Sequence, residues 1–177
     1  MKSMLALTLL FLSCELAVAA DARLVLPDMR FLEAKASEVV SVTLDAPLLG
    51  LAARFLDDNK PEDAAAKQLV ADLKGVYVRS FKFDTDFAYP KADVDALRKQ
   101  LLAPGWQPLV EVRSLKAQTH TDIYISMEGE RANGLVIIAS EPRELTIVNI
   151  VGSIDLQKLH RLEGRFGVPD LQLEDKR

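Results

Sequence analysis

The residues from Gly134 to Gly152 read G-L-V-I-I-A-S-E-P-R-E-L-T-I-V-N-I-V-G, and this stretch decides the fold. Two runs rich in Val and Ile, 135–139 and 145–151, flank the letters E-P-R-E. Val and Ile favour strands, and Pro suits the second position of a type I turn, so the pattern predicts a β-hairpin. Because Ile137 and Ile138 are adjacent, they point to opposite faces of their strand. Both faces are apolar, which predicts a central hairpin covered on both sides.

Length and composition indicate one globular domain. The chain has 177 residues, of which 49% are apolar and 27% are charged, an ordinary globular composition. The formal net charge is −4. An acidic balance without a dense cluster of Lys and Arg argues against nucleic acid and anionic membrane surfaces as partners, because both bind basic patches. We expect a signal peptide over residues 1–20 and a single α+β domain over 21–177.

The N-terminus has the pattern of a secretory signal. Lys2 precedes an apolar run over 5–12 that is too short to span a membrane, and A-V-A at 17–19 fits a cleavage site. The single cysteine, Cys14, is interpreted as part of the signal core that is lost on cleavage. The alternative is a lipidated Cys14, and only then would the mature protein be membrane-anchored. Without Cys14 the mature chain has no disulfide and no thiolate metal site.

The remaining elements follow from apolar periodicity. Strands are predicted at 38–44, 76–83, 106–115, 121–128, 135–140 and 145–151, and helices at 45–56, 61–73 and 93–102, with a last helix carrying Leu156, Leu159 and Leu162. Short links between the last four strands favour an antiparallel meander. The fold class is therefore α+β: a mainly antiparallel sheet with helices packed on it, ending in a four-strand meander and a C-terminal helix.

Several local signals set the expected element ends. Asp45 and Asp93 are predicted to cap the first and third helices. Gly75 is predicted to cap the second helix at its C-terminus. Asn133-Gly134 is a strong turn pair for the link between the fourth and fifth strands.

One row of polar residues is the best catalytic candidate. The residues His120, Asp122, Tyr124, Ser126 and Glu128 alternate with apolar residues and should share one face of a strand. The chemical interpretation is an acid and base surface. The structural interpretation, which we favour, is the solvated face of an antiparallel strand. We therefore assign no catalytic, cofactor-binding or metal-binding residue, and no cofactor.

Other polar positions carry weaker signals. His160 lies on the last predicted helix, and a single histidine does not make a zinc site, which commonly needs three or four protein ligands. Asn149 interrupts an apolar strand and is expected to be a buried amide bonded to backbone, with ligand binding as the alternative. The shared face of Tyr77, Arg79, Phe81 and Phe83 suggests an aromatic-lined groove or, as we prefer, core or sheet-edge packing.

The hairpin sequence G-L-V-I-I-A-S-E-P followed by E-L-T-I-V-N-I-V-G resembles the signature of a family of small exported bacterial proteins, the domain of unknown function 4252. Ile154-Asp155 and the Leu-rich segment after them fit the same family. The resemblance implies an exported bacterial protein of the periplasm or cell envelope. The family supplies no established activity and no catalytic residues, so none are transferred.

Taken together, these features predict an exported, non-enzymatic module that binds an unknown envelope protein or a small ligand. One alternative is an envelope hydrolase that uses the face from His120 to Glu128. Another alternative is a regulatory module in envelope stress sensing. The sequence does not indicate an oligomeric state.

Overall fold

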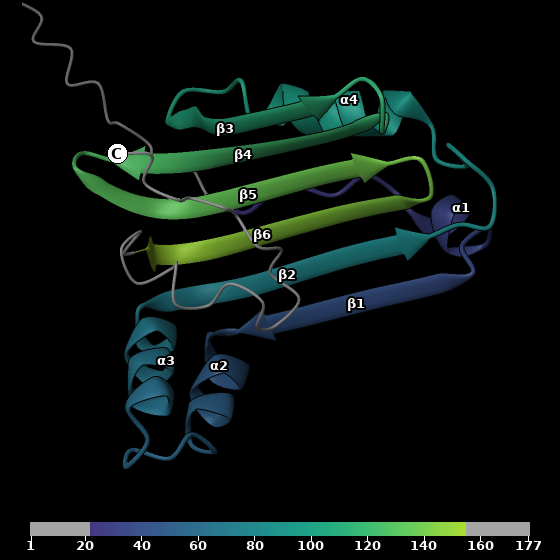
Figure 1. Ribbon diagram of the computed structural model, residues 1–177. Helices are drawn as coiled ribbons and strands as arrows, with labels where there is room; N and C mark the ends of the chain where they lie inside the picture. The colour runs from purple at the N-terminus through teal and green to yellow at the C-terminus, as the bar shows by residue number, and fades with distance from the viewer. Residues whose placement is uncertain (1–21, 155–177) are drawn as a thin grey trace, which may run out of the picture.

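The computed structural model describes residues 22–154 and contains one six-stranded sheet with four helices (Figure 1). The helices are α1 (Arg30–Glu33), α2 (Ala46–Ala53), α3 (Pro61–Ala71) and α4 (Lys91–Gln100). The strands are β1 (Glu38–Asp45), β2 (Leu73–Lys82), β3 (Trp106–Ser114), β4 (Thr119–Glu128), β5 (Arg131–Glu141) and β6 (Glu144–Ile154). The predicted α+β class, with strands and helices in this order, is confirmed.

The sheet is antiparallel throughout, and its strand order is β1-β2-β6-β5-β4-β3. The predicted meander from β3 to β6 is therefore confirmed. The hairpin of β5 and β6 lies in the centre of the sheet, and Glu141 pairs with Glu144 across its tight turn. Ile137 and Ile138 are both fully buried, which confirms that both faces of the hairpin are covered.

Two apolar clusters lie on opposite faces of the sheet. The back face, which is turned away from the viewer in Figure 1, packs against α4, α1 and the N-terminal segment over residues 22–29. On this face Val94 and Leu97 of α4, and Leu101 directly after it, belong to the same cluster as Ile138 and Ile147 of the central hairpin. The front face carries a second cluster, to which β2, β4, β5 and β6 contribute. The sheet therefore has apolar side chains on both sides.

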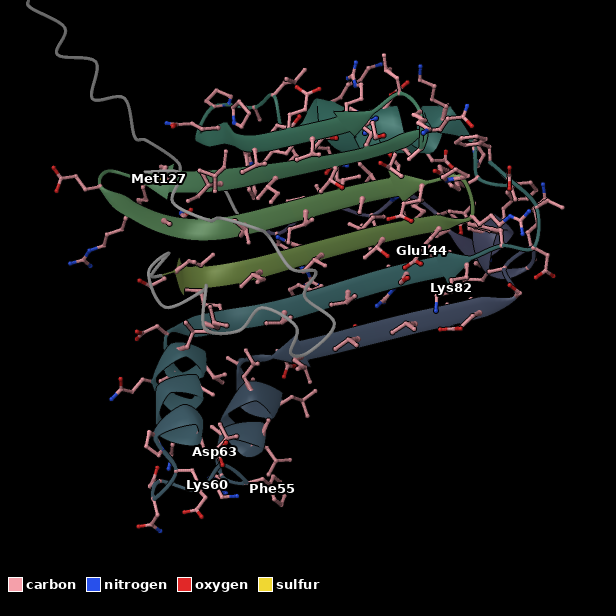
Figure 2. The ribbon with its side chains drawn as sticks, viewed as in Figure 1. Phe55, Lys60, Asp63, Lys82, Met127 and Glu144 are labelled. Atoms are coloured by element: carbon pink, nitrogen blue, oxygen red, sulfur yellow. The ribbon has the colours of Figure 1, made fainter. Side chains whose placement is uncertain are left out.

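Helices α2 and α3 pack on each other at one end of the sheet, beside β1 and β2 (Figure 1). Asp45 caps α2 as predicted, because its Oδ1 accepts a hydrogen bond of 3.0 Å from the Leu48 amide. The apolar residues of this segment do not all pack inward. Leu48, Leu51 and Phe55 are exposed, and Phe55 projects from the tip between the two helices (Figure 2). This pair of helices lies beyond the sheet end, so it buries only a narrow strip.

Three local predictions are wrong for identifiable reasons. Gly75 lies inside β2 and is not a helix cap; a Cβ at this position would lie 2.6 Å from the Tyr77 hydroxyl oxygen. Asp93 lies in the first turn of α4, whose N-cap is Pro90. Asn133-Gly134 belongs to β5, and the turn before it contains Gly129, with a φ of 62°. A glycine adopts positive φ without steric cost, so the chain turns four residues earlier than Asn-Gly suggested.

Two predictions fall outside the described residues. The signal peptide over 1–20, including Cys14, and the C-terminal helix carrying Leu156, Leu159 and Leu162 both lie there, and the last described element is the strand β6. Within residues 22–154, no helix is long and apolar enough to cross a membrane.

Candidate functional site

The polar row on β4 does not face water, and the prediction of a solvated face is wrong. Asp122 and Ser126 are buried. Tyr124 packs beside the back-face cluster, and α4 covers this part of the sheet. Glu128 alone of the row is exposed at the strand end. The alternation correctly predicted that these side chains share one face of β4. That face, however, is the one on which α4 packs.

Arg98 of α4 supplies a positive charge that pairs with the buried carboxylate of Asp122. Its Nε donates a hydrogen bond of 2.7 Å to Asp122 Oδ2, and its side chain is only 20% exposed. The same guanidinium lies 3.0 Å from His120 Nδ1 and 3.6 Å from Asp95 Oδ1. A charge-assisted bond of this length is a strong one, so it ties α4 to β4.

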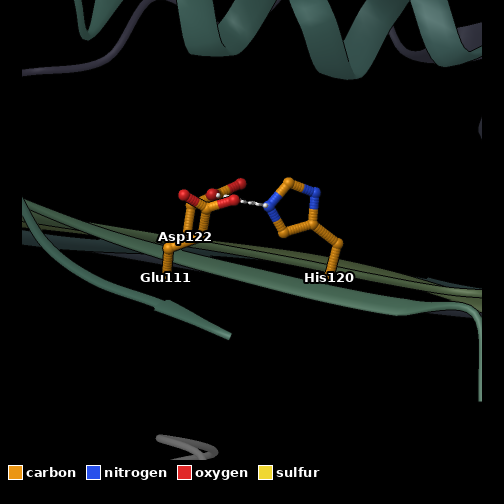
Figure 3. Close-up of side chains that lie close together, drawn as sticks. All are labelled: Glu111, His120 and Asp122. Atoms are coloured by element: carbon orange, nitrogen blue, oxygen red, sulfur yellow. Dashed lines mark ion pairs between the residues drawn. The ribbon is translucent and has the colours of Figure 1, made fainter. Parts of the chain in front are cut away.

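The contacts of His120 fix the position of its proton. Arg98 can only donate hydrogen bonds, so Nδ1 of the neutral ring accepts and the proton lies on Nε2. That atom is buried and lies 2.9 Å from Asp122 Oδ1 and 3.3 Å from Glu111 Oε1, as Figure 3 shows. Neither contact has hydrogen-bond angles, so the attraction is electrostatic. Both ring nitrogens thus face charged groups of the protein, and neither is placed to take a proton from a ligand.

The trio of Glu111, His120 and Asp122 has the ligand spacing of a metal site, since one atom from each lies within 4.8 Å of the others. The contact with Arg98 argues against a metal ion. A metal bound to Nε2 requires a proton on Nδ1, and that proton would point at Arg98 Nη2, which lies 3.0 Å away and is itself a donor. The positive guanidinium also repels a cation. The trio is therefore better explained as a charge network than as a metal centre.

A hollow of about 460 Å³ opens beside this network. His120 and Arg98 line it with Lys91, Phe87 and Tyr89. The Tyr89 hydroxyl donates to the Glu141 carbonyl at 2.6 Å. Burial raises the pKa of Tyr89, and burial followed by the Asp122 charge raises the pKa of Tyr124. His120 thus borders a hollow, whereas Asp122 is not part of its wall.

A second hollow, of about 360 Å³, lies on the back face between the N-terminal segment and the strands β1, β2 and β6. Its polar wall contains Tyr77, Arg79 and Thr43, and Arg23 lies with its guanidinium carbon 4.5 Å from the centre of the Tyr77 ring. Its apolar wall includes Ile147. Phe81 and Phe83, which share this face, are buried core residues. Tyr77 and Arg79 therefore line a groove, whereas Phe81 and Phe83 pack in the core.

Asn149 is the anchor of the N-terminal segment. Its Oδ1 accepts a hydrogen bond of 2.8 Å from the Leu24 amide, and its Nδ2 donates to the carbonyls of Ala22 at 3.0 Å and Leu135 at 3.3 Å. The prediction of a buried amide bonded to backbone is confirmed. This partner could not be predicted from the sequence, because 125 residues separate Asn149 from Leu24. Asn149 also lines the second hollow, beside the N-terminal segment that it holds.

A family model described as "Domain of unknown function (DUF4252)" matches residues 32–162. The chain belongs to this family. The resemblance found in the hairpin is therefore confirmed, and the matched range contains the whole Arg98 network as well as Tyr77, Arg79 and Asn149.

Two further comparisons accompany the DUF4252 match. No curated protein matches the chain. A solved structure, described as crystal form III of TP0453, is similar with 15% sequence identity and a TM-score of 0.23, covering 72% of this chain and 48% of that chain. This chain thus spans less than half the length of that protein, and a TM-score this low assigns neither a shared fold nor a function.

Proposed function

We propose that this DUF4252 protein is an exported, non-enzymatic binding module of the bacterial cell envelope. Its ligand site is the 360 Å³ hollow on the back face. The ligand is a small molecule that combines one negative charge with an apolar part. The observation that carries the proposal is the half-buried Arg79, which lines this hollow without a carboxylate partner among the described residues.

Arg79 is held in place by groups that leave its charge uncompensated. Its Nη1 donates to the carbonyls of Val78 at 3.0 Å and Val42 at 3.3 Å, and approaches the Thr43 hydroxyl at 3.5 Å. Carbonyl oxygens fix the guanidinium but carry no net negative charge. Buried or half-buried charges are usually paired, and a guanidinium fork matches a carboxylate or phosphate group in shape. An anionic ligand would supply the missing partner.

The rest of the wall suits an apolar ligand body. Leu24, Leu26 and Ile147 line the hollow together with the arginines, and no Asp or Glu contributes to its wall. A wall that is mostly apolar with a few convergent polar groups is typical of small-ligand sites, and about 360 Å³ is at the small end of their usual range. The envelope location rests on the signal-like N-terminus and the family resemblance.

The hydrolase alternative has weaker support. His120 does border a hollow, which is the observation that would favour an enzyme. General base catalysis, however, needs a ring nitrogen within reach of the substrate's proton. In His120 one nitrogen faces Arg98 and the other faces two carboxylates. The network is therefore better suited to joining α4 and the sheet than to proton transfer.

Isothermal titration calorimetry with octanoate, octyl phosphate and octanol tests the proposal. We expect the two anions to bind and octanol to bind at least about ten-fold more weakly, since one charge-assisted contact is worth about 1.5–3 kcal/mol. Arg79→Gln should reduce anion binding to the level of octanol. Arg131→Gln, which removes an exposed arginine at the start of β5, is the matched control and should leave binding unchanged. Equal binding of anions to both variants would refute the assignment of Arg79.

A further inference from the structure

Strand β3 forms one edge of the sheet, and its outer side is open. It pairs with β4 on one side, and no other strand among the described residues pairs with it. In Figure 1 it is the uppermost strand. Leu109 and Val112 on this strand are 43% and 56% exposed, and Leu115 directly after it is 85% exposed. A strand edge with unpaired backbone groups and exposed apolar side chains is a template for pairing with another strand.

The first half of β3 is protected from such pairing, but the second half is not. Pro108 has no amide hydrogen to donate, and the register with β4 shifts between Pro108 and Val110, as in a β-bulge. From Val110 to Ser114 the register is regular. Prolines and bulges disrupt an edge locally. The part of the edge that can accept a strand is therefore the stretch 110–114.

This stretch is complementary in charge to itself. When it pairs antiparallel with a copy of itself around Val112, residue 111 of each chain lies opposite residue 113 of the other. Glu111 then faces Arg113 of the second copy, and the twofold symmetry repeats the pair. Opposite charges at directly opposed positions stabilise a sheet, and like charges destabilise it. A shift of one residue removes both pairs, so the charges specify this register.

Both charged groups are free to reach a second chain. Within one chain Arg113 Nη2 lies 2.9 Å from Glu111 Oε1, and the two side chains are 57% and 58% exposed. A guanidinium has five N–H donors and a carboxylate accepts several hydrogen bonds. The contact inside one chain therefore leaves capacity on both groups for a contact between chains.

The opposite edge of the sheet, strand β1, lacks this complementarity. Antiparallel pairing of β1 with a copy of itself around its centre, between Ser41 and Val42, places Glu38 opposite Asp45. That arrangement gives two repulsive pairs in place of two attractive ones. Of the two edges, only β3 is therefore suited to full-length pairing with itself.

The described helices leave the β3 edge accessible. The buried residues of the back-face cluster, on which α4 packs, come from β2, β5 and β6 and from segments outside the sheet, and none of them belongs to β3. The ligand hollow proposed above lies between the N-terminal segment and β1, β2 and β6. Pairing through β3 would therefore leave this hollow open in each copy.

We propose that this chain forms a symmetric dimer in which the β3 strands of two copies pair antiparallel around Val112. The two six-stranded sheets thereby join into one continuous sheet. Two contacts between Glu111 and Arg113 set the register, and Leu109 of each copy approaches Leu115 of the other. The paired stretch is short, and small interfaces are typical of weak association, so the dimer dissociates on dilution.

Cysteine substitution tests the geometry of the dimer. In the full chain with Cys14→Ser, Val112→Cys should form a disulfide-linked dimer on mild oxidation. Opposed residues of an antiparallel pair have Cα atoms about 4.5–5.5 Å apart, which a disulfide can span. Leu115→Cys is the control, because Leu115 is more exposed than Val112, yet its two copies would lie about 20 Å apart in this register. Non-reducing electrophoresis measures both. Faster or equal cross-linking of Leu115→Cys would overturn the proposal.

Charge reversal tests the register. Sedimentation velocity should show that the wild-type chain associates as its concentration rises. Arg113→Glu should weaken this association at least about ten-fold, because Glu111 then faces a glutamate. The double variant Glu111→Arg with Arg113→Glu should restore it, since each arginine again faces a glutamate. Arg131→Glu makes the same charge change at an exposed residue of β5, and this matched control should associate like the wild type.

Three results of the sedimentation experiment contradict the proposal. The first is a wild-type chain that stays monomeric at about 1 mM, where even a weak dimer is populated. The second is a double variant that associates no better than Arg113→Glu, because the register would then be a different one. The third is an equal loss of association in Arg131→Glu, which would trace the effect to net charge and not to the edge of β3.

Discussion

Arg98 Nε on α4 lies 2.7 Å from Asp122 Oδ2 on β4, and this bond joins a helix to the sheet across the back face. The Asp122 side chain is 7% exposed and that of Arg98 is 20% exposed. Removing either group alone takes away the shortest charged contact of the other, and leaves Arg98 only Asp95 at 3.6 Å as a carboxylate partner. The bond is therefore a sensitive point for testing how the back face is held together.

Asp122→Ala should lower the free energy of unfolding by about 1.5–3 kcal/mol, because it removes the charge-assisted bond of 2.7 Å and leaves Arg98 only the longer contact of 3.6 Å to Asp95. Chemical denaturation measures the change. Glu111→Ala is the control: Glu111 is exposed and belongs to the same network, and its loss should cost less than about 1 kcal/mol. The double change Arg98→Met and Asp122→Leu should recover part of the loss, since no charge is left unpaired. Equal stability of Asp122→Ala and wild type would contradict the assigned role.

Asn149→Ala should release the N-terminal segment from the sheet. The substitution leaves the Leu24 amide and the Ala22 carbonyl without their side-chain partner, which costs about 1–3 kcal/mol for buried groups. Hydrogen exchange should show faster exchange at the Leu24 amide and little change in β4. Asn133→Ala is the control, because its side chain makes only a long hydrogen bond of 3.5 Å, to Glu128, among the described residues. Unchanged protection of Leu24 in Asn149→Ala would show that the anchor lies elsewhere.

Gly134→Ala should also displace the N-terminal segment, by a steric route. A Cβ at this position would lie 2.5 Å from the Cβ of Ala22, too close for any real contact. We expect a loss of about 1–3 kcal/mol, as for other overpacked sites. Gly50→Ala offers the opposite case, since nothing lies within 4 Å of its added Cβ and alanine favours the helix by about 1 kcal/mol. Thermal unfolding of both variants should therefore shift in opposite directions, and a shared direction would argue against the steric explanation.

Ionisation of Tyr89 should lower the free energy of unfolding at alkaline pH. Burial raises the pKa of Tyr89 in the folded state, so the folded protein retains this proton where the unfolded chain loses it. The resulting stability is fully present below the ordinary tyrosine pKa of about 10 and is lost as pH rises towards the higher folded pKa. Tyr89→Phe should cost about 1 kcal/mol at neutral pH, since it breaks the bond to the Glu141 carbonyl, and should flatten the alkaline loss. Parallel stability curves for the two chains would contradict this.

The sequence by itself determined the centre of this fold. Adjacent β-branched residues such as Ile137 and Ile138 must point to opposite faces, so an apolar run without alternation predicts a strand covered on both sides. The short links from β3 to β6 likewise allow only antiparallel neighbours, and Asp45 capped its helix through a purely local bond. These features depend on contacts within a few residues, which is why pattern and propensity sufficed.

Tertiary structure alone decided the role of the polar residues. A strand pattern shows that His120 and Asp122 share a face, but whether that face meets water or a helix depends on where α4 packs. Arg98, which neutralises Asp122, is 24 residues away in the chain, and two of the three backbone groups bonded to Asn149, those of Leu24 and Ala22, are more than 120 residues away. Burial and charge pairing are set by the closest approach in space, and no local pattern encodes that approach.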